Sequence, residues 1–196
     1  MEEDSNDRSR VSRRERTNGA SDAGATGRML RERLEPFDVR VAAYDPYVTE
    51  EEAASLGVEL VTLDRLFREA DVVTLHAPLL RETEGLIRVS NLASMKRGAT
   101  LVNTSRGAVV REAEMVSVLE DRPDLWAVLD VTDPEPPEAA SPLYDLPNAV
   151  LTPHVAGSQG DECRRMGRLV VGELRRYVAG EPLEHEITRE RVSLMA

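Results

Sequence analysis

Three residues, far apart in the chain, have side chains suited to acid–base and anion chemistry. His154 stands in "LTPHVAG", directly after an apolar run, and an imidazole that titrates near neutrality can act as a general acid or base. Arg106 follows another apolar run and precedes a glycine, and its guanidinium could bind a substrate carboxylate through two hydrogen bonds. Glu135 lies in the proline-rich "DPEPPE", and a glutamate bonded to a histidine would fix the tautomer of its ring.

Each of these residues also has a purely structural interpretation. A histidine after a strand can be a buried structural residue, an arginine can pair with a neighbouring acid, and a loop glutamate is commonly solvated. The same holds for His76, which stands in "DVVTLHA" and could be a core residue with its hydrogen bonds satisfied. We assign no role to His185, which lies in the polar C-terminal tail.

The elements that would position these residues alternate between short apolar runs and amphipathic stretches. We expect strands at 39–44, 58–63, 71–77, 99–105, 126–131 and 148–153. We expect one helix directly after Gly24 and Gly27, and further helices at 63–70, 91–98, 111–122 and 160–180. This alternation predicts a parallel sheet covered by helices on both faces. In open parallel sheets, ligands bind beyond the carboxyl ends of the strands. The residues just after the strands, which are polar, charged and interrupted by proline, are therefore the candidates for a site.

The composition excludes several classes of partner. The chain has 196 residues and a formal net charge of −11, a balance that argues against nucleic acid and against an anionic membrane surface as main partners. The sequence has no apolar run long enough to cross a membrane and its N-terminus has no secretory signature, so we expect a cytoplasmic protein. A single cysteine, Cys163, excludes an internal disulfide. Only Lys96 is lysine among 25 basic residues, which suits a high-salt cytoplasm or a GC-rich genome.

Five blocks of sequence together resemble the D-isomer-specific 2-hydroxyacid dehydrogenases, the family of phosphoglycerate dehydrogenases and glyoxylate/hydroxypyruvate reductases. The blocks are "AYDPY" (43–47), "DVVTLHAPLLRETEGLI" (71–87), "MKRGATLVNTSRGAVV" (95–110), "LDVTDPEPPE" (129–138) and "NAVLTPHVAGS" (148–158). Their order and spacing agree with the family from about residue 24 to residue 183. Five blocks in register are far more specific than any one of them.

The resemblance implies an NAD-dependent oxidoreductase that acts on the CH–OH group of a small D-2-hydroxy acid, or reduces the 2-keto acid. In it, His154 would exchange a proton with the substrate oxygen, Glu135 would partner His154, and Arg106 would hold the substrate carboxylate. No metal is implied. Candidate substrates are 3-phosphoglycerate, glyoxylate and hydroxypyruvate. Members of the family usually dimerise through the NAD-binding domain, so a homodimer is expected.

The resemblance also implies a set of residues around the cofactor NAD. They are Gly24, Gly27, Arg28, Met29, Asp45, His76, Pro78, Thr104, Ser105, Asp130 and Gly157. Asp45 lies 21 residues after Gly24, near the spacing at which a Rossmann unit holds the adenosine ribose, and its charge would repel a 2′-phosphate and favour NAD over NADP. Asp130 would contact the nicotinamide carboxamide.

The expected fold is therefore α/β, a Rossmann-type doubly wound parallel sheet. We expect a disordered N-terminal segment at 1–18, an NAD-binding Rossmann-like domain at 19–183 and a C-terminal tail at 184–196. The sequence also departs from the family pattern. Asp22 replaces the first glycine of the phosphate-binding turn, and residues 18–21 have no branched apolar side chain, which predicts a degenerate first strand.

The second departure concerns length. Only about 23 residues precede Gly24, so we expect the N-terminal half of the family's substrate domain to be absent, as in an N-terminally truncated chain. We therefore expect very low turnover from this chain alone. The alternative to an active dehydrogenase is a catalytically weak or inactive remnant that binds NAD or only dimerises.

Overall fold

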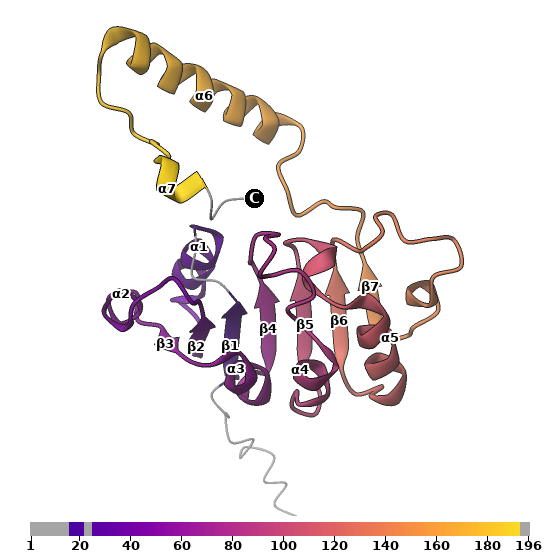
Figure 1. Ribbon diagram of the computed structural model, residues 1–196. Helices are drawn as coiled ribbons and strands as arrows, with labels where there is room; N and C mark the ends of the chain where they lie inside the picture. The colour runs from indigo at the N-terminus through magenta and orange to yellow at the C-terminus, as the bar shows by residue number, and fades with distance from the viewer. Residues whose placement is uncertain (1–15, 22–24, 193–196) are drawn as a thin grey trace, which may run out of the picture.

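Seven parallel strands form one sheet at the centre of the computed structural model (Figure 1). The structure describes residues 16–21 and 25–192. The strands are β1 (Arg16–Ser21), β2 (Val39–Tyr44), β3 (Glu59–Leu60), β4 (Val72–Leu75), β5 (Thr100–Asn103), β6 (Trp126–Leu129) and β7 (Ala149–Leu151). Their order in the sheet is β3-β2-β1-β4-β5-β6-β7. The doubly wound parallel sheet predicted from the alternation of elements is therefore confirmed.

Helices lie against both faces of this sheet, except for the last two, α6 (Asp161–Ala179) and α7 (Arg189–Val192), which stand away from it (Figure 1). The others are α1 (Ala25–Leu34), α2 (Glu50–Ser55), α3 (Leu63–Glu69), α4 (Val89–Ala93) and α5 (Glu112–Asp121), with short 3-10 helices at Gly107–Val109 and Pro142–Tyr144. The chain winds outward from β1 to β3 in one direction and from β4 to β7 in the other. Right-handed crossovers then place α1 and α2 on one face and α3, α4 and α5 on the other.

Two helices were not predicted, and one ends earlier than expected. α2 carries a sequence signal that was overlooked, because Thr49 and Glu52 form a capping box in which each side chain bonds the other's backbone N–H. α7 lies in the segment expected to be a tail. α4 ends at Ala93 rather than at Gly98, which instead forms the turn before β5 with a φ of 76°.

β1 is a full strand, although its side chains hardly favour one. It pairs with β2 from Arg16 to Ser21 and with β4 over its last four residues. Gly19 faces α3, where an added Cβ would lie 2.8 Å from Leu66 Cδ1 and 3.0 Å from Ala70 Cβ. The lack of branched residues that suggested a degenerate strand thus has a packing reason, since α3 lies directly against the backbone. Of the segment 1–18 that was expected to be disordered, residues 16–18 pair in the sheet, so the expectation was wrong for them, and residues 1–15 lie outside the described residues.

Asp71 fixes the beginning of β1. Its Oδ2 accepts a hydrogen bond of 2.8 Å from the N–H of Thr17, and its own N–H donates to the Thr17 carbonyl at 2.8 Å. Lys96, the one lysine of the sequence, pairs with the same carboxylate at 3.2 Å. The start of the central strand is therefore held by side chains as well as by the sheet.

The main hydrophobic core lies between the sheet and the layer of α3, α4 and α5. Its largest fully buried side chains include Leu66, Phe67, Leu75, Ile87, Leu101, Leu125 and Leu129. The central strands β4 and β5 contribute short apolar runs to this core, with Val73 and Leu101 fully or almost fully buried. This core holds the strand ends in fixed positions.

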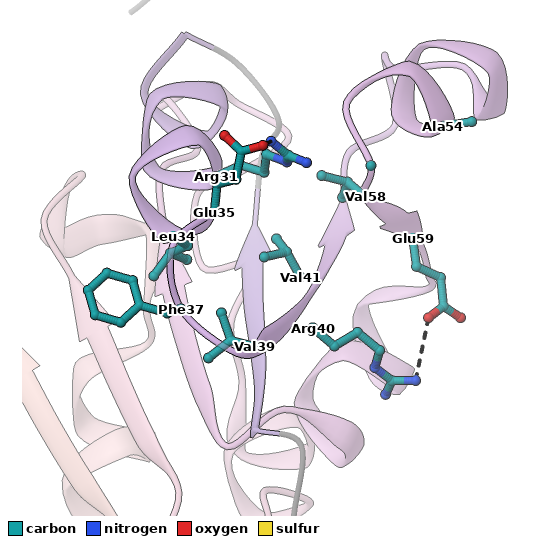
Figure 2. A pocket seen from close by; sticks show the side chains of 11 residues that line it. Arg31, Leu34, Glu35, Phe37, Val39, Arg40, Val41, Ala54, Val58 and Glu59 are labelled. Carbon is teal, nitrogen blue, oxygen red and sulfur yellow. Dashed lines mark ion pairs between the residues drawn. The ribbon is translucent and has the colours of Figure 1, made fainter.

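The opposite face has a hollow of about 460 Å³ between α1 and α2 (Figure 2). Figure 2 shows Val39 and Val41 of β2 beneath it and the ion pair of Arg40 with Glu59, at 3.6 Å, beside it. The hollow lies over the first half of β2, whereas the candidate cofactor residue Asp45 follows the end of that strand. It is therefore separate from the predicted site.

α6 stands away from the sheet (Figure 1). The helix ends at Gly180, as predicted, and Met166, Leu169, Val170 and Leu174 are the apolar residues expected on one side. None of its residues is buried, and Val170 is 64% exposed. Local ion pairs, such as Arg164 with Asp161 at 3.0 Å, support the helix instead of packing. Within the described ranges, no helix is long and apolar enough to cross a membrane.

The contact of β1 with α3 gives a stability prediction. We expect Gly19→Ala to lower the free energy of unfolding by about 1–3 kcal/mol, because a methyl group would be forced against Leu66 in a packed core. The matched control is Gly172→Ala in α6, where an added Cβ meets nothing within 4 Å. Alanine should raise helix stability there by up to about 1 kcal/mol. In urea denaturation, the midpoint should fall in Gly19→Ala and should not fall in Gly172→Ala, and an unchanged midpoint in Gly19→Ala would contradict the packing argument.

Candidate active site

The carboxyl edge of the sheet gathers the predicted polar residues. Asp45 follows β2, His76 follows β4, Thr104 to Arg106 follow β5, Asp130 follows β6, and Thr152 to His154 follow β7. Because all the strands are parallel, these ends lie along one edge. Residues up to 109 positions apart in sequence, from Asp45 to His154, thus share one side of the molecule.

His154 and Glu135 form a hydrogen-bonded pair. The distance from His154 Nδ1 to Glu135 Oε1 is 2.6 Å, and the two side chains are 46% and 42% exposed. A carboxylate at Nδ1 selects the tautomer in which that nitrogen carries the proton when the ring is neutral. Nε2, on the other side of the ring, is then the atom available to a substrate. The predicted partnership of these two residues is therefore present as a contact.

Asp130 holds the turn that carries His154. One oxygen of its carboxylate accepts hydrogen bonds from the Thr152 hydroxyl and, at 2.8 Å, from the N–H of Val155. The other accepts from the N–H of Ala156 at 2.8 Å. These bonds keep His154 in a left-handed backbone conformation, with a φ of 51°, which is uncommon for a residue other than glycine.

The surroundings of Asp130 also favour its charged form. Burial raises the pKa of Asp130, but the bonds from Thr152, Ala156 and Val155, together with the nearby His154, lower it more, so that the pKa lies below its usual value. The prediction for Asp130 was a contact with the nicotinamide carboxamide. The structure adds a role in shaping the His154 turn, which the sequence did not indicate.

Asn103 shapes the turn that carries Arg106. Its Oδ1 accepts from the N–H and the hydroxyl of Ser105, both at 3.0 Å, and its Nδ2 donates to the Arg106 carbonyl at 3.0 Å. Arg106 is exposed, and its Nη1 donates to the Ser105 carbonyl at 2.7 Å. Asn103 was missed in the sequence, although a buried asparagine at the end of an apolar strand was a signal.

The residues predicted around the pyrophosphate and the adenosine ribose belong to the start of α1 and the end of β2. Gly24 falls outside the described residues, while Gly27 is buried in the first turn of α1, and Arg28 and Met29 are exposed. Asp45 Oδ1 accepts from the N–H of Tyr47 at 2.8 Å, which closes the turn after β2. The positive charge of Arg28 lowers the pKa of Glu52, at the start of α2, and the negative charge of Asp45 raises it. The start of α1, the end of β2 and the start of α2 therefore lie near one another.

His76 is half-buried at the end of β4. Its Nε2 lies 3.1 Å from the hydroxyl of Thr74, so one ring nitrogen is already bonded inside the protein. Burial lowers the pKa of His76, which keeps the ring neutral at neutral pH. The Pro78 carbonyl accepts from Thr83 at 2.5 Å, which shapes the following loop. A role for His76 and Pro78 beside a cofactor remains a prediction.

The remaining predicted residues differ in their exposure. Thr104 is exposed at the edge, and Ser105 is 8% exposed and bonded to Asn103. Gly157 is exposed, with nothing within 4 Å of an added Cβ. Among the residues that the structure describes, no three His, Cys, Asp or Glu side chains lie together as metal ligands would.

Comparison with protein families identifies this arrangement. Residues 2–156 match the family described as D-isomer specific 2-hydroxyacid dehydrogenase, NAD binding domain. The chain belongs to this family. The resemblance first seen in five sequence blocks is thereby confirmed, and so is the Rossmann-like character of the sheet.

Individual members of the family show how much of a dehydrogenase the chain spans. It is 34% identical to D-3-phosphoglycerate dehydrogenase from Archaeoglobus fulgidus over 89% of this chain and 33% of that protein. D-lactate dehydrogenase with NAD+ from Lactobacillus jensenii is 27% identical, with a TM-score of 0.74 over 89% of this chain and 56% of that one. The NADPH-dependent glyoxylate/hydroxypyruvate reductase from Sinorhizobium meliloti, in complex with NADP and sulfate, is 27% identical, with a TM-score of 0.75 over 93% and 59%. The chain thus spans between a third and three fifths of these dehydrogenases.

The carboxylate of Asp130 gives a prediction on stability and pH. We expect Asp130→Asn to lower the free energy of unfolding by about 1–3 kcal/mol near neutral pH. The asparagine amide replaces one acceptor oxygen by an NH₂ group, which cannot accept a hydrogen bond. Depending on its orientation, the side chain loses either the bond from Ala156 or the two bonds from Val155 and Thr152. Since folding lowers the pKa of this aspartate, its contribution is present above the ordinary aspartate pKa and is lost as the pH falls through the lowered value.

Denaturation at two pH values tests this prediction. The gap between wild type and Asp130→Asn should narrow from neutral pH to about pH 3. The control is Asp38→Asn, at an exposed turn, which should match wild type at both pH values. Equal stability of Asp130→Asn and wild type at neutral pH would show that the three bonds do not hold the turn.

Proposed function

We propose that this chain carries the cofactor-binding and proton-transfer part of an NAD-dependent oxidoreductase that interconverts a small D-2-hydroxy acid and its 2-keto acid. The observation that carries the proposal is the 2.6 Å bond between Glu135 and His154 at the sheet edge where Arg106 also lies. Keto-acid reduction requires a histidine oriented by a carboxylate and a cation that can bind the substrate carboxylate, and both stand at this edge of the sheet.

The described residues fit a dinucleotide, while Asp22, which replaces the first glycine of the phosphate-binding turn, lies outside the described residues. β1 leads into a helix of ten residues whose first turn contains the buried Gly27, and Asp45 follows the neighbouring strand β2. A small residue in the first turn allows close packing of helix and strand, and an acid at the end of the second strand suits ribose hydroxyls. When bound, NAD would supply hydride chemistry at C2 of the acid.

The residues of this chain would supply the proton and the orientation. In reduction, His154 donates the proton on Nε2 to the keto oxygen, and in oxidation it takes that proton back from the hydroxyl group. Glu135 holds Nδ1–H and stabilises the charged ring. Arg106 binds the substrate carboxylate with paired N–H groups, which orients the keto carbon.

The substrate class follows from these contacts. One guanidinium for a carboxylate and one imidazole for a carbonyl oxygen on the neighbouring carbon select a 2-keto acid. Glyoxylate, hydroxypyruvate and the keto acid of 3-phosphoglycerate are the candidates that agree with the names of the relatives.

The test uses the whole chain with His154→Gln as the matched variant. Wild type should bind NADH, followed by nicotinamide fluorescence, and should oxidise it slowly with glyoxylate or hydroxypyruvate. His154→Gln should bind NADH as wild type does, while turnover falls roughly 100- to 10,000-fold. Equal turnover in both proteins would overturn the assignment of His154.

A second candidate is a binding role without turnover, in which the chain binds NAD or only dimerises. The exposed apolar side of α6, including Val170 and Leu174, favours it, because such residues are commonly covered by a partner. NADH binding without oxidation, or a homodimer in light scattering that binds no NADH, would support this candidate. We place both candidates in the cytoplasm.

The charge of Asp45 gives a prediction on cofactor choice. Wild type should bind NADH at least about tenfold more tightly than NADPH, because a carboxylate at this position repels a 2′-phosphate. Asp45→Asn should narrow that ratio. Asparagine keeps the oxygen that accepts from Tyr47, so the turn after β2 should survive. Glu51→Gln removes the same charge from the exposed side of α2 and should leave the ratio unchanged. Equal ratios in Asp45→Asn and wild type would contradict the role of Asp45.

A further inference from the structure

Glu112 reaches from the start of α5 to the loop that carries Glu135. Its Oε2 accepts a hydrogen bond of 3.0 Å from the N–H of Asp133, two residues before Glu135. The Glu112 side chain is half-buried. Burial raises the pKa of Glu112, although the bond from Asp133 lowers it in part. Burial therefore disfavours the charged form of this carboxylate, and its hydrogen bond is made to the backbone of the loop.

The loop has few other ways to be held. Prolines at 134, 136 and 137 have no N–H, so the backbone donors of this stretch are scarce. The Thr132 hydroxyl bonds to the Pro134 carbonyl at 2.9 Å, which ties the loop only to itself. The bond to Glu112 instead ties it to the end of a helix that packs in the main core.

Gly107 supports the same loop from a second point. An added Cβ at Gly107 would lie 2.0 Å from both the carbonyl carbon and the oxygen of Thr132, so the two backbones are in direct contact. Gly107 follows Arg106 and begins the single 3-10 turn that precedes α5. The segment 106–112 therefore begins with the candidate carboxylate-binding residue and contacts the 132–136 loop through Gly107 and Glu112.

We propose that Glu112 is a positioning residue, which holds the 132–136 loop so that Glu135 reaches Nδ1 of His154 and fixes the tautomer of its ring. The consequence for turnover rests on the proposed function. The consequence for the ring does not, because the tautomer can be observed without substrate or cofactor.

The test is the tautomer of His154 in the full chain. Long-range ¹H–¹⁵N spectra of ¹⁵N-histidine protein, recorded above the imidazole titration at about pH 8.5, distinguish Nδ1–H from Nε2–H. The signals are assigned with His154→Gln. Wild type should show mainly the Nδ1–H form, and Glu112→Ala should move His154 toward the mixture of an unpaired ring, in the same direction as Glu135→Gln.

Matched variants separate positioning from a general loss of structure. Glu112→Gln keeps an oxygen for the Asp133 N–H and should preserve the wild-type tautomer. Glu114→Ala removes a carboxylate from the same first turn of α5, where it accepts from Val89 at 2.6 Å instead, and should leave His154 unchanged. Glu112→Asp keeps the charge but shortens the reach by one methylene. Glu112→Asp should therefore shift the tautomer of His154 less than Glu112→Ala does. If Glu112→Ala does not fold, Glu112→Asp tests the positioning role in its place.

Three outcomes would overturn the inference. They are a wild-type tautomer in both Glu112→Ala and Glu112→Asp, an equal shift in Glu114→Ala, or no shift in Glu135→Gln. If wild type turns over keto acid, Glu112→Ala should lower kcat by about 10- to 100-fold, with NADH affinity unchanged and Glu112→Gln near wild type. If wild type shows no turnover, the proposed function fails while the tautomer experiment still tests Glu112.

Discussion

Backbone pairing between parallel strands holds this molecule in register, and β1 is the strand on which that pairing depends most. It lies between β2 and β4 and joins the two halves of the sheet. Its side chains contribute little apolar surface, so its place rests on backbone hydrogen bonds, on Asp71 at its start and on the fit of Gly19 against Leu66. Every strand end at the carboxyl edge takes its position from this arrangement.

The candidate site is built from turns that are each held by one buried or half-buried polar side chain. Asn103 shapes the turn of Arg106, Asp130 shapes the turn of His154, and Glu112 ties down the loop of Glu135. Such groups are costly to bury unless their hydrogen bonds are made, and here they bond mainly to backbone. The exposed residues suited to chemistry are therefore carried by turns whose conformations are individually specified.

The sheet and α6 follow different rules of stability. The strands and α3 to α5 bury their apolar residues in one core, whereas the apolar side of α6 stays exposed. Helix α6 is held by its left-handed cap at Gly180 and by short-range ion pairs. Core residues and the residues of α6 should therefore respond very differently to substitution.

By itself, the sequence determined the α/β class, the parallel sheet and the family, because apolar runs and family blocks are local patterns, and it nominated the residues of the candidate site, whose roles stay predictions. The β2 boundaries, 39–44, were predicted to the residue, whereas β1 was judged degenerate because strand preference was read without its neighbours. Only the tertiary structure decided that Gly19 must be small, since the reason is Leu66, 47 positions away. The family resemblance already implied the pairing of Glu135 with His154, and the structure supplied its contact, but the structure alone gave Asp130 three backbone and hydroxyl donors and joined Glu112 to Asp133. These contacts join residues 19 to 26 positions apart on different elements, and no local pattern encodes such a distance.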